Sequence, residues 1–346
     1  MNREYHLKIA EELNIDPHQV ESAVRLLDDG ATVPFIARYR KEATGNMDEV
    51  AITNVRDRLN QLRELDKRRA TVLHSIQEQG KLTEELKERI LAAETLAVLE
   101  DIYLPYRPKR RTRATAAKEK GLEPLAEIIF AQEGIDPEAE AVAFVNAEKK
   151  VNSTEEALAG ARDIIAEWVN EDADTRAQLR SLFFKKGILS SRVIRGKEQE
   201  GDKYKDYFQW EELACSAPSH RILAVRRGEK ESFLMVRILP PEEDALAILE
   251  GGFVKSSSAD SRQVQLAVHD SYKRLLSLSL ETEIRLELKK RADKESIEVF
   301  ANNLRELLMA PPLGQKSILA IDPGLRTGCK VVCLDRQGKL VANDTI

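Results

Sequence analysis

Hydrophobic residues recur at helical spacing over most of this chain, which predicts a mainly α, multi-helix scaffold. The clearest stripe lies within residues 48–79 and consists of Ile52, Val55, Leu59, Leu62, Leu65, Val72 and Ile76. The same period predicts further helices near residues 83–101, 122–132, 137–147 and 153–170.

The first thirty residues predict two short helices separated by a tight turn. Asp16 supplies an N-cap, Pro17 the first helical position, and Gln19 the residue that completes a capping box. The region near 1–70 is therefore helix-turn-helix-like, although an ordinary helical hairpin is the simpler interpretation, since neither short helix has a cationic face. Residues 31–46 contain a proline and a glycine and are predicted to form a loop.

The second half of the chain is predicted to remain helical up to a Pro-Pro-Leu-Gly boundary at residues 311–314. Residues 171–229 are assigned to helices, and a strand near 231–239 interrupts them. Two helices are predicted near 260–280 and 282–310. The second of these carries an apolar stripe of Ile297, Phe300, Leu304, Leu307 and Leu308.

These patterns predict three regions. Residues 1–190 form an N-terminal helical domain, residues 191–312 a central helical region, and residues 317–346 the incomplete start of an α/β domain. Three strands with open edges do not make a stable domain alone, so we expect the chain to be the front part of a longer protein.

Residues 317–346 predict strands in place of helices. An apolar strand ends at Asp322, and two shorter strands follow near 328–334 and 339–342. A strand with a terminal Asp, followed by an antiparallel meander, is how RNase-H-like folds begin, and there the first Asp helps to hold a divalent metal. A two-metal site needs several converging carboxylates, which the sequence does not assemble. We therefore predict no catalytic residue, and Asp322 is interpreted as a structural turn residue.

Composition excludes several protein classes. No run approaches the roughly 20 apolar residues of a membrane span, and the N-terminus lacks the apolar region of a signal peptide. Three cysteines do not make a disulfide framework. Cys329 and Cys333 lie in one predicted strand about 13 Å apart, and the histidines are scattered. We expect a cytoplasmic protein with no metal, cofactor or membrane contact.

The densest positive charge lies in residues 104–121, here called the basic segment. Against the single acid Glu119 it contains seven cations, in a chain of net charge -5: Arg107, Lys109, Arg110, Arg111, Arg113, Lys118 and Lys120. Pro105 and Pro108 predict that the segment is a loop with an extended start. Because the guanidinium fork matches phosphate geometry, these seven residues are the predicted nucleic-acid-binding residues.

Two alternatives concern this positive charge. Residues 121–180 contain 14 acidic and 5 basic residues, so the basic segment could instead dock on the chain's own acidic surface. The predicted helix over 48–79 also carries cations mixed with acids, which we interpret as a solvated helix face. These cations are Arg56, Arg58, Arg63, Lys67, Arg68 and Arg69.

Several segments resemble the Tex family of transcription accessory proteins. The strongest likeness lies in residues 32–41, 78–83 and 99–113, with further likeness at 219–224, 270–276 and 321–330. The resemblance implies a helical N-terminal scaffold followed by a resolvase-like RNase H domain, with helix-hairpin-helix and OB-fold RNA-binding modules beyond it. The family is generally regarded as nucleic-acid binding and not nucleolytic.

The sequence therefore favours a non-enzymatic transcription accessory protein that binds RNA or DNA with low specificity. RNA polymerase and ribosome-associated proteins are the expected protein partners. One alternative is a metal-dependent nuclease whose catalytic half lies beyond Ile346. Another is a protein–protein scaffold without direct nucleic-acid contact.

Overall fold

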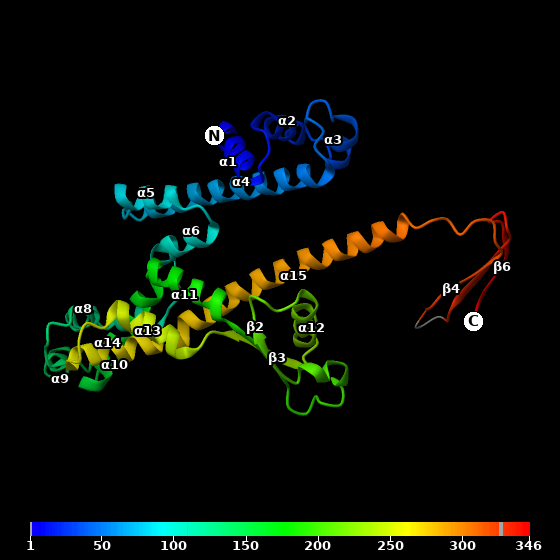
Figure 1. Ribbon diagram of the computed structural model, residues 1–346. Coiled ribbons are helices and arrows are strands. Elements are labelled where there is room, and N and C mark those ends of the chain that lie inside the picture. The colour runs from blue at the N-terminus through cyan, green and yellow to red at the C-terminus, as the bar shows by residue number, and fades with distance from the viewer. Residues whose placement is uncertain (1, 109, 325–327) are drawn as a thin grey trace. The chain divides into compact units, whose positions relative to one another are not determined.

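The computed structural model describes residues 2–108, 110–324 and 328–346 and confirms a mainly helical chain with two small sheets (Figure 1). The chain divides into two compact units. Unit 1 contains residues 1–190, 211–215 and 237–285, and unit 2 contains the remainder. The domain boundaries given above remain predictions. None of the helices in the described ranges is both long and apolar enough to cross a membrane.

Unit 1 begins with three helices that pack on the first half of a long fourth helix. These are α1 (Asn2–Leu13), α2 (Pro17–Asp28), α3 (Val33–Tyr39) and α4 (Glu49–Glu78). The Asp16 carboxylate accepts a hydrogen bond from the His18 amide at 2.8 Å, which confirms the predicted cap. The predicted loop over 31–46 is wrong in part, because α3 occupies its first half. Pro34 is compatible with the first turn of a helix, so it does not exclude one.

The second half of α4 packs against α5 (Glu84–Ala92) and α6 (Leu96–Tyr103) around a separate apolar core. One helix was predicted over 83–101. The structure has two, because Ala93 is extended and the Thr95 hydroxyl caps α6 by accepting from the Val98 amide.

The rest of unit 1 is built around α10 (Thr154–Glu171), whose buried small and branched residues include Ala157, Ala161 and Ile164. The surrounding helices are α7 (Arg113–Glu119), α8 (Glu123–Ala131), α9 (Pro137–Ala141), α11 (Ala173–Lys186), α13 (Glu242–Phe253) and α14 (Ala259–Ser271). The helix predicted near 137–147 ends early, in a 3₁₀ turn over Val142–Phe144. A π-helical turn over Tyr272–Leu276 joins α14 to α15 (Ser277–Leu308), so the predicted break near residue 281 is absent.

The prediction of helices throughout 171–229 is wrong. Strands β1 (Ile188–Val193), β2 (Gln209–Leu213) and β3 (Leu234–Leu239) form a sheet in the order β2-β1-β3, and α12 (Ser219–Lys230) precedes β3. Gly187 and Gly196 bracket the first strand, and burial alternates at Leu189 and Ser191, which is the period of a strand. The strand predicted near 231–239 is confirmed as β3.

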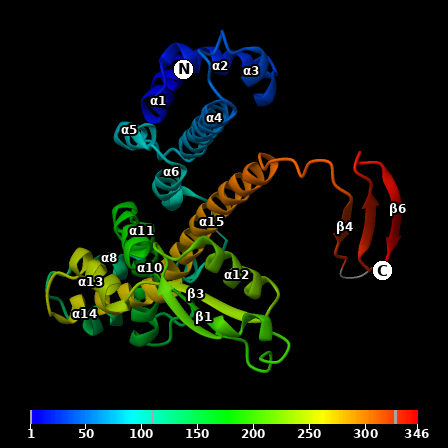
Figure 2. The ribbon, with the colours of Figure 1, turned by 45° about the vertical axis from the view of Figure 1, so that its right-hand side comes forward.

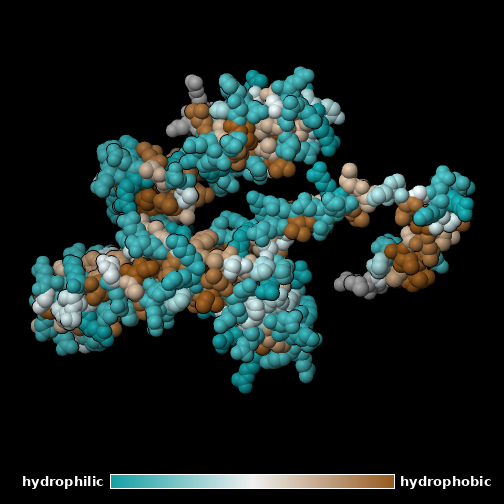
Figure 3. All heavy atoms as spheres, viewed as in Figure 1, coloured by the Kyte–Doolittle hydropathy of each residue, from teal (hydrophilic) through white to brown (hydrophobic). Residues whose placement is uncertain are grey.

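The last residues of unit 2 form the predicted antiparallel meander, shown in Figure 2: β4 (Ile318–Asp322), β5 (Lys330–Leu334) and β6 (Leu340–Thr345). Apolar side chains on this sheet are exposed (Figure 3), among them Leu319 and Val341. The apolar stripe of α15 is also exposed, with 66% of Phe300 and 75% of Leu308 accessible. The hydrophobic spacing therefore predicted this helix correctly. Its apolar stripe, however, is left exposed by the residues that the structure describes.

Candidate nucleic-acid interface

The basic segment changes conformation along its length. A 3₁₀ turn over Leu104–Tyr106 follows α6, the backbone at Arg107 is extended, and α7 begins at Arg113. The Thr112 hydroxyl caps α7 by accepting from the Thr115 amide at 3.0 Å. The extended start is as predicted, but the loop predicted over 104–121 is corrected, because its second half is a helix whose Ala114 and Ala117 are buried.

Arg107 and Arg110 are two cations of the basic segment that have no acidic partner among the described residues. Both side chains are exposed, and within the described part of the chain neither forms an ion pair. Lys109, which was predicted together with them, lies outside the described residues. The extended stretch before α7 therefore presents guanidinium groups that no acid of the described chain compensates.

Two other cations of the segment already have acidic partners. Arg111 pairs with Glu119 at 2.7 Å, and Lys118 pairs with Glu123 at 2.6 Å. The Lys118 ammonium also lies 6.0 Å from the ring centre of Trp168 on α10. Both pairs are substantially exposed, so each holds its cation only weakly. The chain's own acidic segment, residues 121–180, thus pairs with Lys118 but not with Arg107 or Arg110.

Arg113 faces a polar cavity of about 520 Å³ between α7, α10 and α14. Its lining includes the carboxylates of Glu155, Asp163 and Asp270. Arg162 of α10 donates to Glu155, and Arg274 of the π-helical turn donates to Asp163 and Asp270. Burial raises the pKa of Asp163, and the charges of Arg274 and Arg113 oppose that effect. Arg113 is therefore a partly compensated cation.

Lys120 lies at the C-terminal end of α7, and a cation not predicted from the sequence lies close to this end. Gly121 has a left-handed φ of +79°, and a Cβ placed on it would lie 3.0 Å from Nζ of Lys149. Lys149 belongs to an exposed turn that the Asn146–Val151 bridge closes. Sequence reasoning missed it because it belongs to a segment of strong acidic excess, although the Lys149-Lys150 doublet was a visible signal.

The cations of α4 behave differently, because three of the six named above bind acids on neighbouring helices. Arg58 makes two hydrogen bonds to Glu12 of α1, at 2.5 and 2.7 Å, and Arg63 makes two to Asp28 at the end of α2, at 2.8 and 2.7 Å. These hydrogen bonds lower the pKa of both carboxyl groups. The interpretation of α4 as a merely solvated face is therefore corrected, since these residues fasten helices together.

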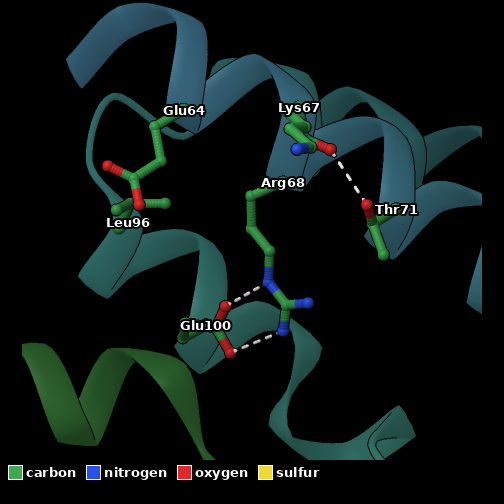
Figure 4. Close-up of a pocket in the computed structure, with 6 residues that line it drawn as sticks. All are labelled: Glu64, Lys67, Arg68, Thr71, Leu96 and Glu100. Carbon is green, nitrogen blue, oxygen red and sulfur yellow. Dashed lines mark hydrogen bonds and ion pairs between the residues drawn. The ribbon is translucent and has the colours of Figure 1, made fainter. Parts of the chain in front are cut away.

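Arg68 fastens α4 to α6 in the same way. Figure 4 shows it reaching from α4 to Glu100, with hydrogen bonds of 2.5 and 3.0 Å. The guanidinium also lies 5.3 Å from the ring centre of Tyr103. Arg68 and Glu100 both line a cavity of about 430 Å³ at the junction of the two helices. The arginine in this cavity therefore already has an acidic partner.

The helix that leads into the basic segment is anchored by a buried ionic cluster. Asp101 of α6 accepts from Arg176 at 2.6 Å and pairs with Arg180 at 2.7 Å, and both arginines also reach Glu283. Asp101 and Arg176 are each only 6% exposed at the side chain. A buried carboxylate between two arginines fixes α6, and thereby the origin of the basic segment, against α11 and α15.

Asp322, the residue that matches the first acid of an RNase H site, ends β4 opposite Lys330 of β5. Asp335 accepts hydrogen bonds from the Gln337 and Lys339 amides and so shapes a hairpin turn. Among the described residues, no three His, Cys, Asp or Glu side chains gather as metal ligands would.

Comparison with protein families gives three matches in order along the chain. Residues 3–77 match the Tex-like protein N-terminal domain, residues 132–300 the Tex central region-like domain, and residues 316–346 the Tex protein YqgF-like domain. The basic segment lies between the first two matched ranges.

The similarity to known proteins covers nearly the whole chain. It is 44% identical to Protein tex of Bordetella pertussis over 353 residues, which are 98% of this chain and 45% of that protein. It is 41% identical to Transcriptional accessory protein Tex of Neisseria gonorrhoeae over 98% of this chain and 45% of that protein. It is 28% identical to human S1 RNA-binding domain-containing protein 1 over 100% of this chain and 36% of that protein.

The chain thus spans about half the length of its bacterial relatives. Its three matched ranges nevertheless all belong to the Tex family, and the alignments with these relatives cover 98% of the chain. The chain belongs to the Tex family.

Proposed function

We propose that this chain is a non-enzymatic, nucleic-acid-contacting part of a transcription accessory protein. In this proposal the basic segment binds the phosphates of RNA or DNA. The observation that carries the proposal is that Arg107 and Arg110 are exposed and not neutralised by any described acid, in a chain with an excess of acidic residues. An unpaired cationic stretch in such a chain is best satisfied by an external polyanion.

The chemistry of the segment specifies the kind of contact. Arginine forks bind phosphate oxygens through paired hydrogen bonds, but phosphates carry no sequence information, so binding is of low specificity. The names of the relatives agree with this proposal: one is called a transcriptional accessory protein, and another contains an S1 RNA-binding domain. RNA polymerase or ribosome-associated proteins are the proposed partners, in the cytoplasm.

The test is fluorescence anisotropy of the 346-residue chain with labelled single- and double-stranded RNA and DNA at two salt concentrations. A variant with Arg107, Lys109, Arg110, Arg111 and Arg113 changed to Gln is measured beside it. We expect salt-sensitive binding that the variant loses for all sequences alike. Magnesium is added to a parallel sample, in which we expect no cleavage.

Two results would count against the proposal. Equal binding by the variant would place the contact outside the basic segment. If neither protein binds nucleic acid, the segment instead fits a protein scaffold, which a partner captured from nuclease-treated extract would support.

A further inference from the structure

Helix α3 places two aromatic rings on the surface of unit 1. Val33, Ile36 and Ala37 point into the core and are at most 8% exposed. On the opposite face, at helical spacing, Phe35 is 39% exposed and Tyr39 is 68% exposed. Because removing a large aromatic side chain from water is favourable, two such rings exposed on one short helix are a candidate binding surface.

The rings are held in a fixed arrangement beside positive charge. The Phe35 and Tyr39 ring centres lie 5.5 Å apart at an interplanar angle of 43°. The Arg40 guanidinium lies 5.1 Å from the Phe35 ring centre and donates to the Tyr39 carbonyl at 3.0 Å. Phe35 is therefore flanked by Tyr39 and Arg40, whereas most of Tyr39 remains open.

The turn after α3 is fastened by hydrogen bonds to its own helix and to α2. The Thr44 side chain is fully buried, and its hydroxyl donates to the Arg40 carbonyl at 3.1 Å. Gly45 has a φ of +60°, and the Gln19 side chain donates to its carbonyl at 2.9 Å. A Cβ on Gly45 would meet Nε2 of Gln19 at 2.1 Å, so the turn is closely fitted to α2.

Three cations lie next to the rings in the sequence. Arg38, Arg40 and Lys41 are all exposed, and the acids that follow them up to the start of α4 are Glu42, Asp48 and Glu49. Arg38 and Glu49 approach to 3.5 Å, with side chains 68% and 50% exposed, so this pair is loose. Lys41 has no ion pair within the described residues.

We propose that α3 and the turn that follows it form a stacking platform for single-stranded nucleic acid. An unpaired base stacks on Tyr39, whose back is supported by Phe35, and the adjacent phosphates lie against Arg38 and Lys41. Exposed aromatic rings beside cations are the chemistry by which single strands are bound, since every base has a stacking face. This inference rests on the proposed function only in requiring that the chain binds nucleic acid.

A duplex does not fit this surface in the same way, because its bases are already stacked on one another. The platform and the basic segment are thus expected to differ in what they recognise. The basic segment binds phosphates of either form, whereas the platform adds affinity only for unpaired bases.

The test compares a labelled uridine 12-mer with an RNA duplex of the same length, using the whole 346-residue chain. Tyr39→Ala should weaken binding of the single strand about 5- to 150-fold, the range that corresponds to loss of one stacked base, and leave duplex binding unchanged. Tyr39→Phe keeps the ring and should bind like the wild type. Leu91→Ala, which removes another exposed apolar side chain of unit 1, is the matched control. Circular dichroism checks that each variant is folded.

The outcomes separate this inference from the proposed function. If Tyr39→Ala binds the single strand as well as the wild type does, or loses both strand forms equally, the platform is refuted while the basic segment stands. If the wild-type chain binds neither form, both proposals fail. A 5-bromouridine 12-mer irradiated with the protein should crosslink to α3, and a crosslink map without α3 would also overturn the inference.

Discussion

The cations of α4 and those of the basic segment are both clustered in the sequence, yet their surroundings in the structure are opposite. On α4, Arg58, Arg63 and Arg68 each make two hydrogen bonds to a carboxylate of another helix. In the extended part of the basic segment, Arg107 and Arg110 have no acid of the described chain within ion-pair distance. Only the second arrangement leaves charge for an external partner.

Whether a cation is free to bind a ligand therefore depends on acids that are far away in sequence. Glu12, Asp28 and Glu100 lie 46, 35 and 32 positions from their arginines. A count of nearby charges cannot reveal such partners.

The largest expected effect on stability is at the buried carboxylate of Asp101. Asp101→Asn should reduce the free energy of unfolding by about 3–5 kcal/mol, because it leaves Arg176 and Arg180 without their shared buried anion. Urea denaturation followed by circular dichroism measures this loss. Glu119→Gln, which breaks the exposed pair with Arg111, is the control and should cost well under about 1 kcal/mol. Similar losses in both variants would show that burial does not distinguish the pairs.

A smaller loss of stability is expected at Thr112, the residue that caps α7. Thr112→Ala removes the hydroxyl that accepts from the Thr115 amide and should cost about 1 kcal/mol. Thr112→Ser keeps the cap and should restore most of the stability in the same melting experiment. An alanine variant as stable as the wild type would contradict the assigned cap.

The interhelical pair of Arg63 and Asp28 should show a coupling energy of about 0.5–1 kcal/mol, since both side chains are 40% exposed. A double-mutant cycle with Arg63→Gln and Asp28→Asn measures it. A coupling near zero would mean that α4 fastens α2 by apolar contacts alone. In that case its cations would be as free as those of the basic segment.

The smallest effect is a pH dependence. Hydrogen bonds from Arg58 and Arg63 lower the pKa of Glu12 and Asp28, so the folded state holds fewer protons than the unfolded state in mildly acidic solution. Their contribution to stability is complete above about pH 4–4.5 and is lost as the pH falls through the lowered pKa values. Urea midpoints at several pH values should fall less steeply in a Glu12→Gln, Asp28→Asn variant than in the wild type.

The local signals for helices predicted much of the fold. The cap at Asp16 and the apolar period of α4 were predicted correctly, because helix boundaries depend on nearby residues. The strands β1 and β2 were missed, since short strands depend on partners such as β3 that are distant in sequence. The loop assigned to 31–46 concealed α3, and with it the exposed rings of Phe35 and Tyr39.

The candidate site was predictable as a charge cluster but not residue by residue. Composition identified the basic segment, yet Lys118 and Arg113 proved to face acids, and Lys149 joined the segment from an acidic region. The seven predicted contacts remain predictions. Which of these cations have acidic partners could be seen only in the three-dimensional structure.

The most direct test of the central claim compares the salt dependence of RNA binding in two variants that lose equal charge. Arg107→Gln with Arg110→Gln removes two free cations, whereas Arg58→Gln with Arg63→Gln removes two that pair with Glu12 and Asp28. The first variant should lower the slope of log K against log salt by about 1.4–1.8, or about 0.7–0.9 per phosphate contact. The second should leave the slope almost unchanged. Equal slopes in both variants would contradict the claim that pairing decides which cations meet nucleic acid.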